Sequence, residues 1–154
     1  EIGAIIVKSD TLTEIARFET KVKPDHIETG SPESLSVAGY KESAWEAAPP
    51  LREALANYLS AAEGSLFAAW CTPYDWLFFL EALKKTNLKN PLGHRTLDIF
   101  SIAYEKLQNN PAAQGLGLSS LAAHLGIPKE PMPHRAINGA ECALEVYKKL
   151  RALP

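Results

Sequence analysis

Two short segments of the sequence hold side chains whose type and spacing could do chemistry. In AAWCTPYDW, Asp75 falls in the first turn of an expected helix that follows an apolar strand. Ligand sites of open α/β folds gather at this edge of a sheet, although a carboxylate there also stabilises the helix dipole by about 0.3–1 kcal/mol. In PHRAINGAEC, His134 directly precedes the last expected helix, and an imidazole can take up a proton near neutral pH. Gly139, five residues further on, is out of place because glycine weakens a helix interior.

Length and composition indicate one globular domain without a broad basic surface. Hydrophobic residues make up 46% and charged residues 22% of the 154 residues, so the chain can bury a core of its own. The formal net charge of −2 gives no overall attraction to a polyanion. Any contact with nucleic acid must therefore be local, at a cleft or a metal ion.

The two cysteines and the lack of long apolar runs indicate the cellular compartment that we expect for the protein. Cys71 and Cys142 lie far apart without CxxC spacing, so no zinc site is evident. We expect two buried free thiols in a reducing, cytoplasmic compartment, with a disulfide as the alternative. No run approaches the roughly 20 apolar residues that span a bilayer, and none resembles a signal peptide, so no membrane partner is expected. The chain starts at Glu1 without a methionine, which suggests a fragment, a processed form or a missing preceding segment.

The elements that must position these residues alternate between strands and helices. This order predicts an α/β fold with a mixed sheet of about five strands, covered by helices on both faces. Because the runs Glu1–Val7 and Ser65–Cys71 are apolar on each face, we expect them to pair directly or through one strand. The remaining expected elements are a hairpin strand Glu14–Pro24, a short helix near Pro32–Ala38 in an irregular stretch, and helices from Leu51, from Thr72 as N-cap, from near Asp98, over Gly117–Ile127 and over Ala136–Leu150.

Five segments taken in order resemble one known family. The chain resembles the DnaQ-like 3′–5′ exonucleases, the DEDDh group of the ribonuclease H-like fold. The resemblance covers 1–154 as a single exonuclease domain that is N-terminally incomplete, because the family's first strand, with its Asp-x-Glu motif, would precede Glu1. The matching segments are EIGAIIV, AAWCTPYDWLFFL, RTLDIFSIAYEKL, GLGLSSLAAHLGI and HRAINGAECALEVY.

The resemblance implies hydrolysis of phosphodiester bonds by two divalent ions, Mg²⁺ or Mn²⁺, held by four carboxylates beside a histidine base. By position, Asp75 matches the second-motif metal ligand and His134 matches the general base. Gly139 falls where the third motif has its aspartate, so that ligand is lost. Since the two first-motif carboxylates would precede Glu1, one carboxylate of the family's four is present.

Two aromatic residues near Asp75 are candidate substrate-binding side chains. Trp70 and Tyr74 could stack on the terminal nucleotide, although core packing is the ordinary role for Trp70 beside a strand end. The family has a histidine and an asparagine where this chain has Trp70 and Cys71.

Three functions follow from these observations. The first is a 3′–5′ exonuclease for single-stranded nucleic-acid ends that uses Mg²⁺ or Mn²⁺, with the chain as written inactive or impaired. The second is a degenerate module that binds a single-stranded 3′ end or a protein partner without cutting and without a metal. The third is unrelated work on the same scaffold. The choice between DNA and RNA, and the oligomeric state, stay open.

Overall fold

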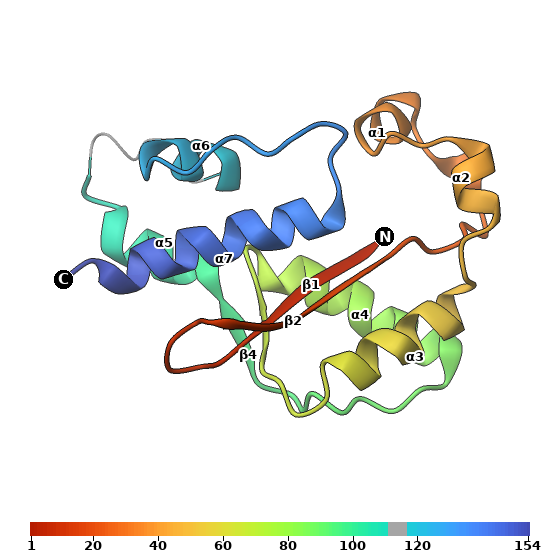
Figure 1. Cartoon of the computed structure of the whole chain (residues 1–154), viewed down its shortest axis with the longest axis horizontal. Helices are drawn as coiled ribbons and strands as arrows, with labels where there is room; N and C mark the ends of the chain where they lie inside the picture. The colour runs from red at the N-terminus through yellow and green to blue at the C-terminus, as the bar shows by residue number, and fades with distance from the viewer. Residues whose placement is uncertain (111–116) are drawn as a thin grey trace.

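The computed structural model describes residues 1–110 and 117–154 (Figure 1). Its element order is that of an α/β protein, as predicted. The elements are β1 (Ile2–Val7), β2 (Glu14–Thr20), a 3₁₀ turn (Ile27–Thr29), α1 (Pro32–Val37), α2 (Glu42–Glu46), α3 (Leu51–Ala61), β3 (Phe67–Ala69), α4 (Thr72–Thr86), β4 (Thr96–Asp98), α5 (Ile99–Leu107), α6 (Leu118–His124) and α7 (Ala136–Ala152).

The strands form two pairs instead of one larger sheet. β1 and β2 make the predicted antiparallel hairpin, with Ile2 opposite Thr20. β3 and β4 pair in parallel, with Phe67 opposite Thr96. Within the described residues β1 pairs only with β2 and β3 only with β4, so the predicted five-stranded sheet and the link between Glu1–Val7 and Ser65–Cys71 are wrong. An apolar run indicates that a strand is covered, but it does not say whether strands or helices cover it.

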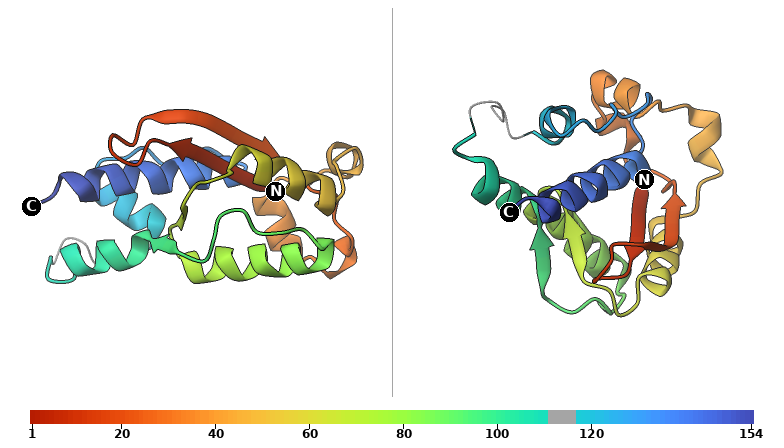
Figure 2. Two further views of the ribbon diagram at one scale, coloured as in Figure 1. Left: turned by 90° about the horizontal axis from the view of Figure 1, so that it is seen from below. Right: turned by 60° about the vertical axis from the view of Figure 1, so that its left-hand side comes forward.

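A helix lies against β1 at very short distance. β1 is half-buried along its whole length, and α7 packs on it more extensively than any other helix does (Figure 2). Gly3 allows this approach, because a Cβ atom there would lie 2.3 Å from the backbone nitrogen of Ile137. The start of α7 is therefore fixed by the hairpin.

Two apolar clusters make up the core. One joins α5, α6 and α7, where Val146 and Leu150 are fully buried. The other joins α3 and α4, and β1 and Phe18 of β2 pack against it. Tyr58 lies between Phe18 and Phe79, with ring centroids 5.8 Å and 6.2 Å away. The second cluster therefore connects the hairpin to α4.

One face of α4 is exposed, although the many apolar residues of this segment favour a well-buried helix. Phe79 and Leu83 belong to the core. Leu77 and Phe78 are 60% and 74% exposed. Apolar residues occur all round this helix, and within the described residues it packs on α3, β3 and β4, which leave Leu77 and Phe78 uncovered.

Two further expectations can be compared with the structure. Cys71 and Cys142 are free thiols, half-buried and buried respectively, and no disulfide joins them. Among the described residues, no helix is both long enough and apolar enough to cross a bilayer.

Candidate functional site

The first turn of α4, which carries Asp75, is held by the neighbouring strand β4. Thr72 is buried, and its hydroxyl donates to the carbonyl of Leu97 over 2.8 Å. Its backbone N–H donates to a carboxylate oxygen of Asp98 over 2.9 Å. The predicted N-cap at Thr72 is thus displaced by one residue, because Cys71 takes the cap position without a side-chain bond and Asp98 supplies the acceptor.

Asp98 caps two helices at once, a role that sequence reasoning missed. Its second oxygen accepts the backbone N–H of Ser101 over 2.9 Å at the start of α5. Burial raises the pKa of Asp98, but the hydrogen bonds from Ser101 and Thr72 outweigh that effect and hold it below its ordinary value. This one carboxylate aligns α4 and α5 at the carboxyl ends of β3 and β4.

Asp75 lies in the first turn of α4, as predicted. The residue as a whole is exposed, yet partial desolvation of its carboxyl group raises its pKa, and a hydrogen bond with its own backbone opposes the shift. Within the described residues no basic side chain forms an ion pair with it: the ion pairs there involve other acids. Its carboxylate is therefore available to a cation or a hydrogen-bond donor.

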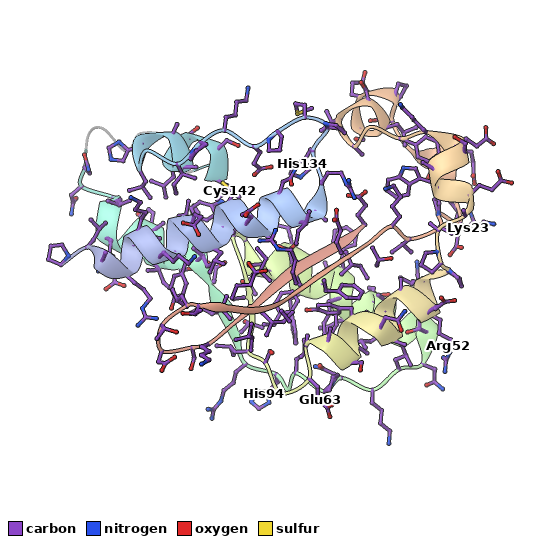
Figure 3. All side chains as sticks on the ribbon, in the orientation of Figure 1. Lys23, Arg52, Glu63, His94, His134 and Cys142 are labelled. Atoms are coloured by element: carbon purple, nitrogen blue, oxygen red, sulfur yellow. The ribbon has the colours of Figure 1, made fainter. Side chains whose placement is uncertain are left out.

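His134 is fixed from two sides, directly before α7 (Figure 3). Its backbone N–H donates to the carbonyl of Val37 over 3.0 Å, which ties it to the end of α1. Its ring Nδ1 lies 2.8 Å from a carboxylate oxygen of Glu130. Next to it, Gly39 has a φ of +62° and lies so close to Pro133 that a Cβ atom would be 2.6 Å from the proline ring. The irregular stretch before α3 thus holds the histidine segment in place.

The spacing between His134 and Gly139 brings the two together in space. A Cβ atom on Gly139 would lie 3.6 Å from Cε1 and 4.0 Å from Nε2 of the imidazole. These are ordinary van der Waals distances, so a side chain at 139 would point at the ring without a clash.

The start of α7 is capped by the first residue of the chain. Glu1 accepts the backbone N–H of Ala136 over 3.2 Å and pairs with Arg135 over 3.1 Å. Its side chain is only 9% exposed. Glu141 pairs with Arg17 at 3.3 Å. Both acids are engaged in structural contacts, so neither stands in for the carboxylate that is missing at 139.

The aromatic candidates have different surroundings. Trp70 is half-buried against the cluster of α5 to α7 and meets Phe100 edge-on, with ring centroids 6.0 Å apart. Its carbonyl also accepts the backbone N–H of Phe100. This placement corresponds to the core-packing alternative for Trp70. Tyr74 is 69% exposed at the start of α4 and is accessible to a ligand.

Asp75 and His134 are held by different parts of the molecule. α4 packs on α3, β3 and β4, whereas α7 packs on β1, α5 and α6. No hydrogen bond between the two side chains occurs in the described part of the chain. Two shallow surface hollows, of about 300 and 280 Å³, are lined by other residues, at 10–12 with 148, 151 and 152 and at 64–66 with 92–95. A shared cleft for Asp75 and His134 stays a prediction.

This arrangement of elements matches that of known nucleases. A profile of the family described as Exonuclease (RNase_T) matches residues 1–147. The chain belongs to this exonuclease family. The predicted relation to DnaQ-like, DEDDh-type exonucleases of the ribonuclease H-like fold is confirmed.

Two solved structures share the exonuclease fold with this chain. The structure described as "3'-end specific recognition of histone mRNA stem-loop by 3'-exonuclease" has a TM-score of 0.78 at 14% identity, and the match covers 97% of this chain and 54% of that one. This chain therefore spans about half of that protein's length. The nuclease domain of 3'hExo, described as a DEDDh family member bound to rAMP, has a TM-score of 0.74 at 17% identity, covering 96% of this chain and 78% of that one. No curated protein sequence matches this chain.

Proposed function

We propose that this exonuclease-family domain recognises the 3′ end of a single-stranded nucleic acid, and that the 154-residue chain alone hydrolyses that end poorly or not at all. The observation that carries the proposal is the geometry at position 139. A side chain there would point at the imidazole of His134, but glycine supplies none. The contacts that hold His134 are present, while the carboxylate that the family has at position 139 is missing.

Recognition of a nucleic-acid end has support from the fold and from accessible side chains. The two structural neighbours are described as a 3′-exonuclease with a histone mRNA stem-loop and a nuclease domain bound to rAMP. In this chain Tyr74 exposes an aromatic ring on which a base can stack. The half-exposed His134 offers a ring nitrogen to a hydroxyl group. Since the net charge is −2, such local contacts have to supply the affinity.

The residues present do not fit a two-metal centre. Asp75 is the single carboxylate of this sequence at a position that matches a family ligand, because Gly139 has no side chain. Glu1 does not substitute for a ligand, because it caps α7. The described residues contain no group of three or more histidine, cysteine, aspartate or glutamate side chains that could hold a metal ion. Mg²⁺ or Mn²⁺, which the family typically uses, would need carboxylates that these positions do not supply.

The proposal can be tested by measuring binding and cleavage separately. Fluorescence anisotropy of short single-stranded RNA and DNA oligonucleotides, labelled at the 5′ end, measures affinity for ends that carry a 3′-hydroxyl or a 3′-phosphate. Release of 3′-labelled nucleotides in Mg²⁺ or Mn²⁺ measures cleavage. We expect preferential binding to the free 3′-hydroxyl end with cleavage at or near background.

A second histidine provides a matched control. His94 is exposed and lies on the opposite side of the molecule from His134 (Figure 3). His134→Ala should weaken binding of the 3′-hydroxyl end, whereas His94→Ala should not. Equal affinity for both kinds of end, or equal effects of the two substitutions, would refute end recognition at this site. Efficient metal-dependent release of nucleotides by the unmodified chain would refute the second half of the proposal.

A protein partner is the second candidate, and the outer face of α4 favours it. Tyr74, Leu77 and Phe78 are 69%, 60% and 74% exposed and lie within one turn of each other on the helix. Neighbouring large apolar side chains in solvent often mark an interaction surface. If this face binds a protein, Phe78→Ser should leave the affinity for oligonucleotides unchanged. If it contacts the nucleic acid, the affinity should fall.

A further inference from the structure

Glu130 contacts the side chains of both His134 and Cys142, and the proposed function assigns no role to this carboxylate. It lies in the segment between α6 and α7, and its side chain is only 17% exposed. One of its oxygens lies 2.8 Å from Nδ1 of His134. It also forms a hydrogen bond with the thiol of Cys142, a buried residue of α7. The carboxylate thus bridges the helix and the histidine in front of it.

The protonation states of these groups decide the direction of both hydrogen bonds. Burial, together with the charge and the hydrogen bond of Glu130, raises the pKa of Cys142 to about 11, so the thiol keeps its proton at neutral pH. An ionised carboxylate can only accept hydrogen bonds. With Glu130 in its carboxylate form, both Cys142 and His134 donate to it, and the proton of a neutral His134 ring resides on Nδ1.

The other ring nitrogen of His134 then carries the lone pair. Nε2 lies 4.0 Å from the position that a Cβ atom on Gly139 would occupy. Cε1 lies at 3.6 Å, so the ring edge formed by Cε1 and Nε2 borders the place where the side chain is missing. Backbone contact between His134 and Val37 limits rotation of the segment as a whole.

We propose that Glu130 is a positioning residue that fixes the Nδ1–H tautomer of His134 and turns Nε2, as a hydrogen-bond acceptor, toward position 139. There Nε2 accepts a hydrogen bond from a hydroxyl group or a water molecule at the bound 3′ end. The second step rests on the proposed function, but the tautomer does not. A carboxylate that orients a histidine through one ring nitrogen sets the role of the other.

Nuclear magnetic resonance of ¹⁵N-labelled histidine tests the tautomer without any nucleic acid. At about pH 8, above the ordinary imidazole pKa near 6.5, the ring nitrogen shifts should show His134 with its proton on Nδ1. His26 is an internal comparison, because its Nδ1 lies 3.2 Å from Glu28 but both side chains are largely exposed, at 76% and 68%. His26 should show the Nε2–H form that predominates in solvated histidine.

Substitution of Glu130 is the second part of the test. Glu130→Ala should shift His134 toward the Nε2–H form and reduce affinity for a 3′-hydroxyl end by about tenfold, the upper range for one hydrogen bond. Glu141→Ala, which removes another acid of the α7 region that pairs with Arg17 and not with His134, should change neither quantity.

The outcomes separate this inference from the proposed function. An Nε2–H tautomer in the unmodified protein overturns the role of Glu130, whether or not oligonucleotides bind, and this result does not depend on the folding of any variant. An Nδ1–H tautomer that persists in a folded Glu130→Ala protein also overturns it. An Nδ1–H tautomer that is lost on substitution supports it, even if no 3′ end binds.

Discussion

Gly3→Ala and Gly139→Ala add the same methyl group at two very different sites. The space at Gly3 is filled by backbone atoms, whereas the space at Gly139 is open. At Gly3 the new Cβ would lie 2.3 Å from the nitrogen of Ile137 and 2.4 Å from the carbonyl carbon of Ala136. Both are backbone atoms of α7, so no side chain can rotate away. Reaching ordinary contact at 3.4 Å requires strand and helix to separate by about 1 Å, the difference between 3.4 and 2.3.

The structure resists that separation. Glu1 caps the first turn of α7, and the far end of the helix is anchored by the fully buried Val146 and Leu150. Overpacking in a well-packed core costs about 1–3 kcal/mol, and we expect the upper end of that range for Gly3→Ala. For a domain of this size each kcal/mol corresponds to about 2–4 °C, which predicts a fall in Tm of about 6–12 °C.

Gly139→Ala is the matched counterpart. Its new Cβ would have no neighbour closer than 3.6 Å, in the ring of His134. Alanine is favoured over glycine in a helix by about 0.8–1.0 kcal/mol, so the free energy of unfolding should rise and Tm should increase by about 2–4 °C.

Thermal and urea unfolding of the two variants beside the unmodified chain measures these shifts. The reasoning predicts opposite signs. If Gly3→Ala melts within about 2 °C of the unmodified chain, the close approach of β1 to α7 does not exist in solution. If Gly139→Ala is destabilised, position 139 is not an open helical site facing His134.

Other outcomes are expected from the same geometry. Asp98→Ala should lower the free energy of unfolding by about 1–2 kcal/mol because two helix starts lose their acceptor; thermal melts should show a smaller loss for Asp98→Asn. Because the pKa of Asp98 lies below its ordinary value, its stabilising effect should be complete above about pH 4 and be lost as the pH falls further, so the unmodified chain and Asp98→Asn should converge in acid melts. Gly139→Asp alone should not restore metal-dependent cleavage, and His134→Ala should leave the background rate of nucleotide release unchanged; a clear increase in release by Gly139→Asp would contradict the first expectation. Trp70→Ala should cost less stability than the about 3–5 kcal/mol typical of a fully buried aromatic residue, because Trp70 is half-buried, whereas Tyr74→Ala should keep Tm and weaken binding of the 3′ end in anisotropy measurements.

Local sequence patterns predicted the elements more reliably than their partners. The last helix was expected over Ala136–Leu150 and extends over Ala136–Ala152, because an apolar stripe of helical period is a local property. The hairpin of β1 and β2 follows from an apolar run, a short polar turn and an imperfectly alternating second strand. The prediction that β1 and β3 belong to one sheet was wrong. The residues of a strand do not show which distant strand it pairs with.

In the candidate site, too, local spacing was predictable from the sequence and contacts between distant residues were not. The proximity of His134 and position 139 follows from a spacing of five residues at a helix start, and the structure places them in contact range. Sequence reasoning missed Glu1 and Glu130, the partners that fix this geometry, and Asp98, which holds the helix that carries Asp75. Each acts through a contact with another element or loop. One usable signal was present at Glu1, since an acid that begins an apolar strand has to find a partner or a helix start.

The glycine at position 139 therefore removes one side chain from the candidate site but leaves the contacts of the His134 segment in place. A glycine removes a potential ligand, yet the Val37 contact, the Glu130 contact and the close fit of Gly39 on Pro133 all act on the segment before α7 and do not involve a side chain at 139. The position of the segment that carries His134 thus does not depend on a side chain at 139. Metal-dependent hydrolysis requires several carboxylates at once, whereas a hydrogen bond from a terminal hydroxyl to Nε2 requires only the fixed histidine. Binding of an end can persist after hydrolysis is lost, and for this reason affinity and cleavage have to be measured on the same variants.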